Sequence, residues 1–236
     1  MRVLVIPDIH LKPWMFMRAS ELLTEVQADR AVCLMDIADD WKQGLNIDLY
    51  IKTYDTAIQF AEDHPETLWC FGNHDVSYLW ELPESGYSQL AEWPVCEKLR
   101  KLAETLRNPL QLAFLHRIDN VLFSHAGLAE DYVAKYVPFK YIDDIDAVVT
   151  EINGLCHRCL WQDLSPIWFR PQYSGRKMYK QGELLQVVGH TPVSQINEKD
   201  SVISCDVFST HGDGTPIGTQ EFLIVDTVSW EYRGIK

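Results

Sequence analysis

The chain has 236 residues, which is long enough for one large hydrophobic core, and we expect a single domain over residues 1–236. Its 21 Lys and Arg residues against 34 Asp and Glu residues give a formal charge of −13, which repels nucleic acid, so a large nucleic acid is not an expected partner. No apolar run approaches the length of about 18 residues that a membrane span needs. The first apolar run is too short for a secretory signal. With only six cysteines, we expect a cytoplasmic protein without a membrane partner.

The first 75 residues alternate between β-type runs and segments with helical periodicity. Strands are expected at 3–6, 30–35 and 67–71. Helices are expected at 14–27 and 48–63. This alternation predicts a parallel sheet with right-handed crossovers.

The pattern changes after a further helix at 90–106. The runs 110–115 and 120–123 are expected to form a hairpin through residues 117–120. We then expect a helix at 142–152, a long loop at 166–182, and strands at 184–188, 202–205, 222–225 and 228–232. Late strands with short links predict a second, mixed sheet.

Polar residues that can bind metal ions follow five of the expected strands. They are Asp8 and His10, Asp36 and Asp39, Asn73 and His74, His125, and His190. Each alone has an ordinary explanation, such as a helix cap or a solvated turn, but sites in open α/β sheets form outside the carboxyl ends of strands. The joint pattern therefore predicts one cleft that can hold two metal ions.

The remaining histidines and a Cys-x-x-Cys pair are read as separate from this cleft. His64, His116 and His157 are expected at the surface or at helix ends, whereas His211 lies in a loop that could approach the site. Cys156 and Cys159 have zinc-ligand spacing, but a structural zinc site needs four ligands and no second pair exists. We expect these two cysteines to be free thiols.

Five ordered motifs carry a resemblance to a known family. They are Asp8-Ile9-His10, Asp36-Ile37-Ala38-Asp39, Gly72-Asn73-His74-Asp75, His125-Ala126-Gly127 and Gly189-His190-Thr191-Pro192. The chain resembles the calcineurin-like metallophosphoesterases from residue 1 to about residue 206, and within them the phosphoprotein phosphatases and the symmetrical diadenosine tetraphosphate hydrolases. The resemblance implies a four-layer α/β/β/α sandwich of mixed sheets, with the site at the strand ends.

The resemblance also implies a role for each motif residue. Asp8 and His10 would bind the first metal, and Asp36 would bridge both. Asn73, His125 and His190 would bind the second, with Asn73 also near the substrate phosphate. His74 would be the general acid, oriented by Asp39, while a hydroxide that bridges the metals attacks. Two divalent ions are implied, with manganese the usual activator in the family and iron or zinc also suited to mixed imidazole, carboxylate and amide ligands.

The chain departs from the family pattern at three positions. Met35 stands where the family has glycine, and Asp40-Trp41 replaces an Arg-Gly pair whose arginine binds phosphate. Arg170, in a segment similar to the family's Trp-x-Arg, is the candidate replacement. Arg176 and Lys177 are the fallback, and all three could instead belong to a solvated basic loop.

The function expected from these features is metal-dependent hydrolysis of a phosphorylated substrate. A protein-phosphatase-like phosphomonoesterase is the first hypothesis, acting on a phosphoprotein or on a small phosphate ester or nucleotide. A diadenosine tetraphosphate hydrolase or phosphodiesterase is the alternative, which Asp75 in place of the usual glutamate slightly favours. A non-catalytic scaffold is disfavoured because every metal ligand and the catalytic histidine are present.

Overall fold

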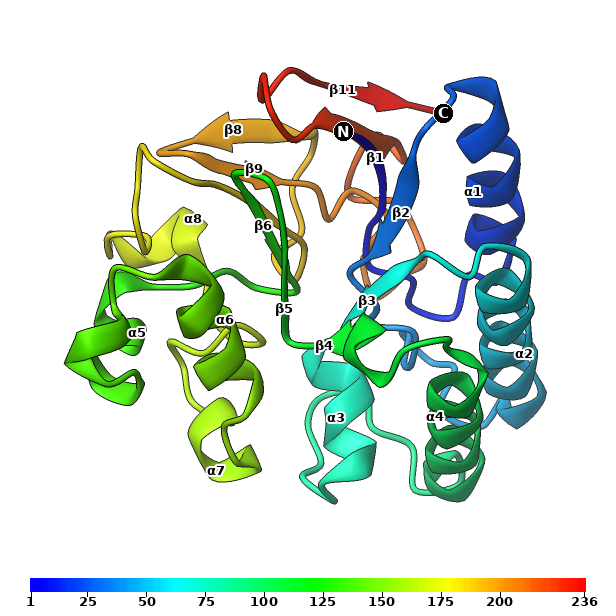
Figure 1. The fold of residues 1–236 in the computed structure, drawn as a ribbon. Helices are drawn as coiled ribbons and strands as arrows, with labels where there is room; N and C mark the ends of the chain where they lie inside the picture. Colours follow the sequence, from blue (N-terminus) through cyan, green and yellow to red (C-terminus); the bar gives the residue numbers. More distant parts are fainter.

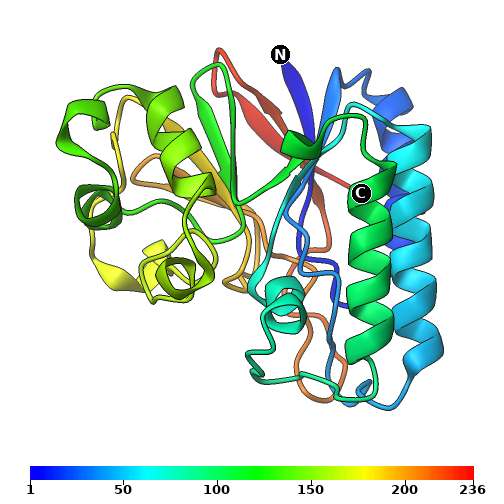
Figure 2. The same ribbon diagram turned by 60° about the horizontal axis from the view of Figure 1, so that its bottom comes forward.

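The computed structural model describes residues 1–236. Two β-sheets pack face to face, and helices cover the outer face of each sheet, as Figures 1 and 2 show from two directions. The four-layer α/β/β/α arrangement expected from the resemblance is therefore confirmed. None of the helices combines the length and apolar character needed to cross a bilayer.

The first sheet has six strands in the order β11-β10-β1-β2-β3-β4. Their bounds are β1 (Arg2–Ile6), β2 (Arg30–Cys33), β3 (Leu68–Cys70), β4 (Leu112–Ala113), β10 (Phe222–Asp226) and β11 (Tyr232–Ile235). Strands β1 to β4 are parallel, and β10 and β11 add an antiparallel edge. The predicted parallel core of this sheet is confirmed.

The second sheet has five strands in the order β5-β6-β7-β9-β8. Their bounds are β5 (Leu115–Ile118), β6 (Val121–Ser124), β7 (Leu185–Val188), β8 (Asn197–Lys199) and β9 (Val202–Ser204). Strands β6, β7 and β9 are parallel, while β5 and β8 run antiparallel at the edges. This sheet is mixed, as expected.

The helices form the two outer layers. Beside the first sheet lie α1 (Trp14–Glu25), α2 (Ile47–Asp63) and α4 (Glu92–Thr105). Beside the second lie α5 (Glu130–Tyr136), α6 (Ile145–Asn153), α7 (His157–Leu160) and α8 (Pro171–Ser174), with 3-10 turns η1 (Pro109–Gln111) and η2 (Phe139–Tyr141) in the connections. Helix α3 (Asn73–Leu79) begins directly at the end of β3.

Strand β1 shows how the sequence builds two cores at once. Successive side chains of a strand point to opposite faces. Val3 and Val5 belong to the cluster between the two sheets, together with Phe123 and Val187 of the second sheet. Leu4 and Ile6 belong to the cluster under α1, α2 and α4. A separate cluster lies under α5 and α6.

The chain crosses between sheets where a single hairpin strand was expected at 110–115. Residues 109–111 form η1, capped by the side chain of Asn108, and β4 then joins the edge of the first sheet. Only from Leu115 does the chain pair with β6, through a two-residue turn at Asp119 and Asn120. The single strand expected at 110–115 was wrong, because its residues divide between the first sheet and the second.

The last strand begins later than expected from the run 228–232. The Asp226 side chain accepts hydrogen bonds from the amides of Val228 and Ser229, both at 2.9 Å, which fixes these residues in a turn. Strand β11 therefore starts at Tyr232, and Val228 stays exposed.

His116 corrects an expectation: it is buried in β5 rather than lying at the surface or a helix end. Its Nε2 donates a hydrogen bond of 3.0 Å to the carbonyl oxygen of Trp69 in β3. Burial lowers the pKa of His116 to about 4, although the Trp69 hydrogen bond opposes that change. The side chain is therefore neutral in the folded protein at neutral pH. By contrast, His64 ends α2 and His157 begins α7, as expected.

This lowered pKa predicts an acid-sensitive contribution to stability. Because the unfolded chain binds a proton near the ordinary pKa of about 6.5, stability from His116 is full above that pH and is lost as pH falls toward 4. Between pH 7.5 and 5.0 the loss should be about 2 kcal/mol. Urea unfolding of the protein and of His116→Gln at both pH values measures it. The loss of unfolding free energy in His116→Gln should be smaller by about this amount. Equal losses in the two proteins would show that His116 is not the source of the acid sensitivity.

Candidate metal centre

The six expected metal ligands all follow the carboxyl ends of parallel strands. They are Asp8 and His10 after β1, Asp36 after β2, Asn73 after β3, His125 after β6, and His190 after β7. Because the two sheets pack face to face, strand ends from both sheets meet at one place, and the structure brings all six residues together there.

Three ligand atoms converge around Nε2 of His125. This nitrogen lies 3.2 Å from Oδ2 of Asp36, 3.0 Å from Oδ1 of Asn73 and 3.1 Å from Nδ1 of His190. The other ring nitrogen, Nδ1, lies 3.0 Å from the carbonyl oxygen of Leu34. A carbonyl only accepts, so Nδ1 carries a proton there, which leaves Nε2 as the ring nitrogen that can bind a metal ion.

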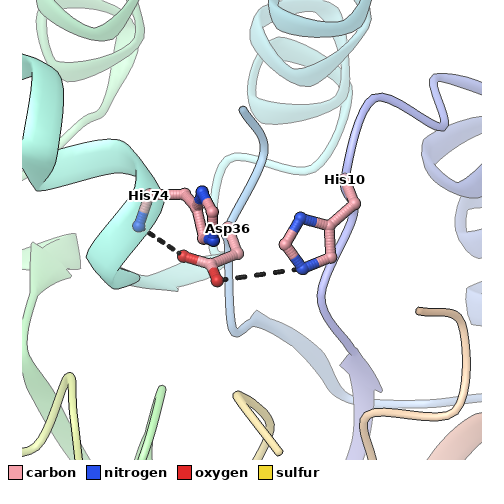
Figure 3. Close-up of side chains that lie close together, drawn as sticks. All are labelled: His10, Asp36 and His74. Atoms are coloured by element: carbon pink, nitrogen blue, oxygen red, sulfur yellow. Dashed lines mark hydrogen bonds and ion pairs between the residues drawn. The ribbon is translucent and has the colours of Figure 1, made fainter. Parts of the chain in front are cut away.

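His10 also approaches the Asp36 carboxylate, and Figure 3 shows His10 on one side of Asp36 and His74 on the other. Nδ1 of His10 donates a hydrogen bond of 2.9 Å to the carbonyl oxygen of Asp39, which turns Nε2 toward Asp36, 3.9 Å from Oδ2. Ligand atoms of His10, Asp36 and His74 lie within 4.8 Å of one another, as do those of Asp36, His125 and His190. Asp36 is common to both groups and lies between them.

Asp8 connects the ends of β1 and β7. Its Oδ1 accepts a hydrogen bond of 2.7 Å from the backbone amide of His190, whereas its buried Oδ2 has no partner. Gly189 leaves the space that this carboxylate fills, because a β-carbon there would collide with Oδ2. A β-carbon at Gly72 would likewise collide with the carboxylate of Asp36.

The donor set fits a cation. The inward-facing atoms are carboxylate and amide oxygens and imidazole nitrogens, whose lone pairs repel one another unless positive charge lies between them. Burial lowers the pKa of His125, but the negative charges of Asp36 and Asp8 outweigh the effect of burial and raise this pKa to about 9. Burial also opposes ionisation of Asp36, yet the three surrounding histidines hold its pKa below the usual range. The negative charges that hold a proton on His125 would also favour the binding of a divalent ion.

Several site residues adopt left-handed backbone conformations. His10, Asp36, Asp39 and His190 have φ between 42° and 62°, which is uncommon for residues with side chains. Such strain persists at functional sites where the surroundings impose it. Met35 also has φ of 57°, which explains why glycine suits that position in the family that the sequence resembles.

His74 lies beside the ligand cluster at the start of α3. Its amide donates to Oδ1 of Asp36 at 3.0 Å, and its Nδ1 lies 2.9 Å from Oδ2 of Asp39. Burial lowers the pKa of His74, but Asp36, Asp39 and Glu84 together raise it to about 10. With Nδ1 engaged, Nε2 is the ring nitrogen left for a substrate.

The carboxylate of Asp39 is fixed by two tyrosines. Its Oδ1 accepts hydrogen bonds from Tyr50 at 2.7 Å and Tyr78 at 2.6 Å. Asp75 acts elsewhere, because it accepts hydrogen bonds from the Ile37 amide and the Tyr54 hydroxyl and so holds the turn after β2 against α3. Neither tyrosine contact to Asp39 was predicted, because the hydroxyls come from two separate helices, α2 and α3.

A cleft of about 490 Å³ opens over this cluster, lined by His10, Asp36, Asn73, His74, His190 and Arg170 among others. Arg170, the expected phosphate ligand, donates to the carbonyl oxygen of His190 and to Oγ1 of Thr191, both at 3.2 Å. Its guanidinium thus lies at the rim of the cleft beside a metal-ligand candidate.

Two acidic residues in the cleft were not predicted from the sequence. Glu84 accepts a hydrogen bond of 2.6 Å from the Asn73 amide nitrogen, which turns Oδ1 of Asn73 toward His125. Asp206 is buried at the end of β9, and after burial its carboxylate is the largest cause that raises the pKa of Asp8. Asp206 follows a β-run as the other site residues do, so that signal was available. Glu84 lies in a turn with no pattern to mark it.

Asp40 is less repulsive toward phosphate than its sequence position suggests. Lys12 forms an ion pair with it at 3.2 Å, and both side chains are largely buried. Asp40 also accepts a hydrogen bond of 3.0 Å from Oγ1 of Thr210. Asp40, which replaces the family's arginine, is therefore neutralised by Lys12. Its contacts hold together the segments that carry Lys12, Asp40 and Thr210.

Other residues considered from the sequence lie outside this cleft. Arg176 and Lys177 line a different cavity and pair with Asp131 and Glu130. His211 is exposed and does not line the cleft. Cys156 and Cys159 are free, with sulfur atoms 3.6 Å apart, and no metal-ligand group includes them.

A sequence model of the calcineurin-like phosphoesterases matches residues 1–215. The chain belongs to this family. As a calcineurin-like phosphoesterase, it is a metal-dependent hydrolase of phosphate esters, and the family implies divalent metal ions and phosphorylated substrates. A comparison with curated protein sequences finds no match.

Solved structures share the fold of this calcineurin-like phosphoesterase at low sequence identity. A cold-active protein tyrosine phosphatase has a TM-score of 0.57 and 16% identity, over 100% of this chain and 78% of that one. The cold-active protein tyrosine phosphatase of the psychrophile Shewanella sp. has a TM-score of 0.54 and 16% identity, with 100% and 80% covered. An archaeal phosphodiesterase is a weaker match, with a TM-score of 0.43 that does not establish a shared fold and with 14% identity, over 100% of this chain and 99% of that one.

Proposed function

We propose that the ligand cluster holds two divalent metal ions in one domain formed by residues 1–236. Asp8, His10 and Asp36 would hold one ion, and Asp36, Asn73, His125 and His190 the other. The convergence of acceptor atoms on Nε2 of His125, together with the unpartnered oxygen of Asp8, supports this assignment. Manganese is the proposed metal, because mixed oxygen and imidazole ligands suit it and the sequence resembles a manganese-activated family.

The proposed reaction is hydrolysis of a phosphomonoester by a protein-phosphatase-like mechanism. The observation that carries it is the His74–Asp39 pair, because a protonated imidazole beside the cluster can give its proton to a leaving oxygen. The solved structures with TM-scores above 0.5 are described as protein tyrosine phosphatases, which agrees with this choice.

The remaining steps of the reaction fall to different residues of the chain. Bound divalent ions would activate water and neutralise phosphoryl charge. Arg170 and the amide nitrogen of Asn73 would bind the phosphoryl oxygens, which requires Glu84 to release that amide. Asp39 would keep His74 charged and oriented, and Nε2 of His74 would donate its proton to the leaving oxygen.

Glu84 favours a second candidate function. Its carboxylate lies at the amide that would bind phosphate, and this negative charge disfavours a doubly charged monoester more than a singly charged diester. A phosphodiesterase or dinucleoside polyphosphate hydrolase is therefore the alternative.

Metal analysis followed by a substrate panel separates these candidates. The panel contains p-nitrophenyl phosphate, its bis ester, phosphopeptides and diadenosine tetraphosphate. Two bound metals per chain with fastest turnover of monoesters support the proposal. Turnover confined to the bis ester or the dinucleotide would favour the alternative, and a metal-loaded protein inactive on the whole panel would refute both.

Arg170→Ala should raise KM for a phosphomonoester and leave metal content unchanged. Loss of a charged hydrogen bond to phosphate costs about 1.5–3 kcal/mol, which corresponds to a rise of roughly 10- to 100-fold. Steady-state kinetics with p-nitrophenyl phosphate measures it. Arg176→Ala is the matched control, because that arginine comes from the same loop but lines another cavity. Equal effects of the two substitutions would show that Arg170 does not bind phosphate.

A further inference from the structure

The indole of Trp41 is presented at the cleft in an unusual way. Its side chain is 59% exposed although it is held firmly in place. Its Nε1 donates a hydrogen bond of 2.8 Å to the carbonyl oxygen of Thr210, and its backbone amide donates to Oδ1 of Asp40. A fixed, exposed indole that lines a cleft offers an aromatic face to a ligand that binds there.

The loop that holds the indole is itself ordered. Backbone hydrogen bonds from His211 to Thr215 and from Ile217 to Ser209 close residues 209–217 on themselves. The loop runs beside the indole ring, because a β-carbon added at Gly212 would lie 3.9 Å from two of the ring carbons. The Lys12–Asp40 pair, bonded to Thr210, secures the segment that carries Trp41. The position of the ring is therefore set before any ligand binds.

Trp41 differs from the other two aromatic residues of the cleft. Tyr87 already stacks on Tyr78, with ring centroids 4.3 Å apart. Trp168 makes edge contacts with Trp161 and His190. Trp41 stacks on no ring of the protein, so its face is available.

Trp41 and the proposed proton donor His74 share one cleft. Trp41 is two residues after Asp39, which holds His74, the proposed donor of a proton to the leaving oxygen. Both side chains line the same cleft. A group attached to that oxygen would therefore lie in the cleft that Trp41 also lines.

The charges of the cleft restrict what that group can be. Its acidic lining residues are Asp36, Asp39, Asp40, Glu84 and Asp206, and its Lys and Arg residues are Lys42 and Arg170. Lys12 already offsets Asp40, and two divalent ions would leave the cleft only slightly positive, which matches the charge of a single phosphoryl group rather than that of a chain of several phosphates. A single phosphoryl group on an uncharged ring suits this balance better than a dinucleoside polyphosphate.

We propose that Trp41 forms a subsite for an aromatic leaving group, so that the substrates are aryl phosphomonoesters of the phosphotyrosyl type. The inference rests on the proposed phosphomonoesterase activity. The ring of the substrate lies against the indole, while the phosphoryl group occupies the metal centre and His74 protonates the phenolic oxygen.

Two peptides of identical sequence, one with phosphotyrosine and one with phosphoserine, test the proposal. Trp41→Ala should raise KM for the phosphotyrosine peptide on the order of tenfold, with kcat nearly unchanged. The phosphoserine peptide should be unaffected, and Trp41→Phe should restore most of the loss. Trp93→Ala is the control, because Trp93 is 72% exposed on α4 but does not line the cleft.

A binding measurement provides a readout independent of turnover. The indole N–H signal of Trp41, identified by its absence in Trp41→Phe, is followed by NMR during titration with phenylphosphonate or methylphosphonate. Phenylphosphonate should shift this signal at lower concentration than methylphosphonate. Equal responses to the two ligands would argue against a ring-binding subsite.

Each other outcome has a distinct meaning. Equal losses of Trp41→Ala on both peptides, or no loss on either, would overturn the subsite while leaving the phosphomonoesterase proposal intact. A loss confined to diadenosine tetraphosphate would replace the aryl subsite with one for a nucleobase. Failure of the unmodified protein to hydrolyse any monoester would refute the proposed function and this inference together.

Discussion

Asp36→Asn should remove bound metal and activity together. Asp36 is the one residue common to both ligand groups, and its Oδ2 lies between His10 and His125. Removal of a residue that merely orients a metal ligand costs about 10–100-fold, so loss of a shared ligand should lower kcat/KM by more than about 100-fold. Metal analysis and kinetics on the same preparation measure both effects.

The fold should survive this substitution, because asparagine has nearly the same shape and can still accept the hydrogen bond from the His74 amide. Asp75→Asn is a useful comparison. That buried carboxylate contacts Ile37 and Tyr54 rather than the ligand cluster, so its replacement should lower thermal stability more than metal content. Full metal occupancy in Asp36→Asn would contradict the assignment of Asp36 as the shared ligand.

His74→Asn should slow substrates with poor leaving groups by roughly 10²–10⁴-fold, the usual contribution of general acid catalysis. Metal content should change little, since six other residues are proposed as ligands. Activity on p-nitrophenyl phosphate should fall much less, because nitrophenolate leaves without a proton. Turnover of an alkyl phosphate and of p-nitrophenyl phosphate, measured side by side, gives the comparison.

Asp39→Asn should produce a weaker version of the same selective loss, because it leaves the His74 ring in place but removes the carboxylate that helps to keep it charged. Equal losses on good and poor leaving groups in both variants would argue that His74 binds metal or phosphate rather than donating a proton. His74 also belongs to one of the two ligand groups, so this outcome has a structural basis.

The sequence by itself determined the alternation of strands and helices that builds the first sheet, whereas the four layers were implied by the family resemblance. In β1, alternating Val3, Leu4, Val5 and Ile6 serve two cores, which requires a strand buried on both faces. The same local logic placed Asp8, Asp36, Asn73, His125 and His190 just after strands. Both results depend on the order of neighbouring residues, and a sequence displays that order directly.

Only the tertiary structure decided how separate segments complete the site. The Lys12–Asp40 pair, the Glu84–Asn73 hydrogen bond and the hydrogen bond from the Trp41 indole to Thr210, in the loop after β9, join residues from different segments of the chain. The expectation for His116 was wrong for the same reason, because His116 is buried against the other sheet, where the carbonyl oxygen of Trp69 accepts its hydrogen bond. Such contacts depend on how the two sheets pack and where their connecting loops return. No local spacing encodes that geometry.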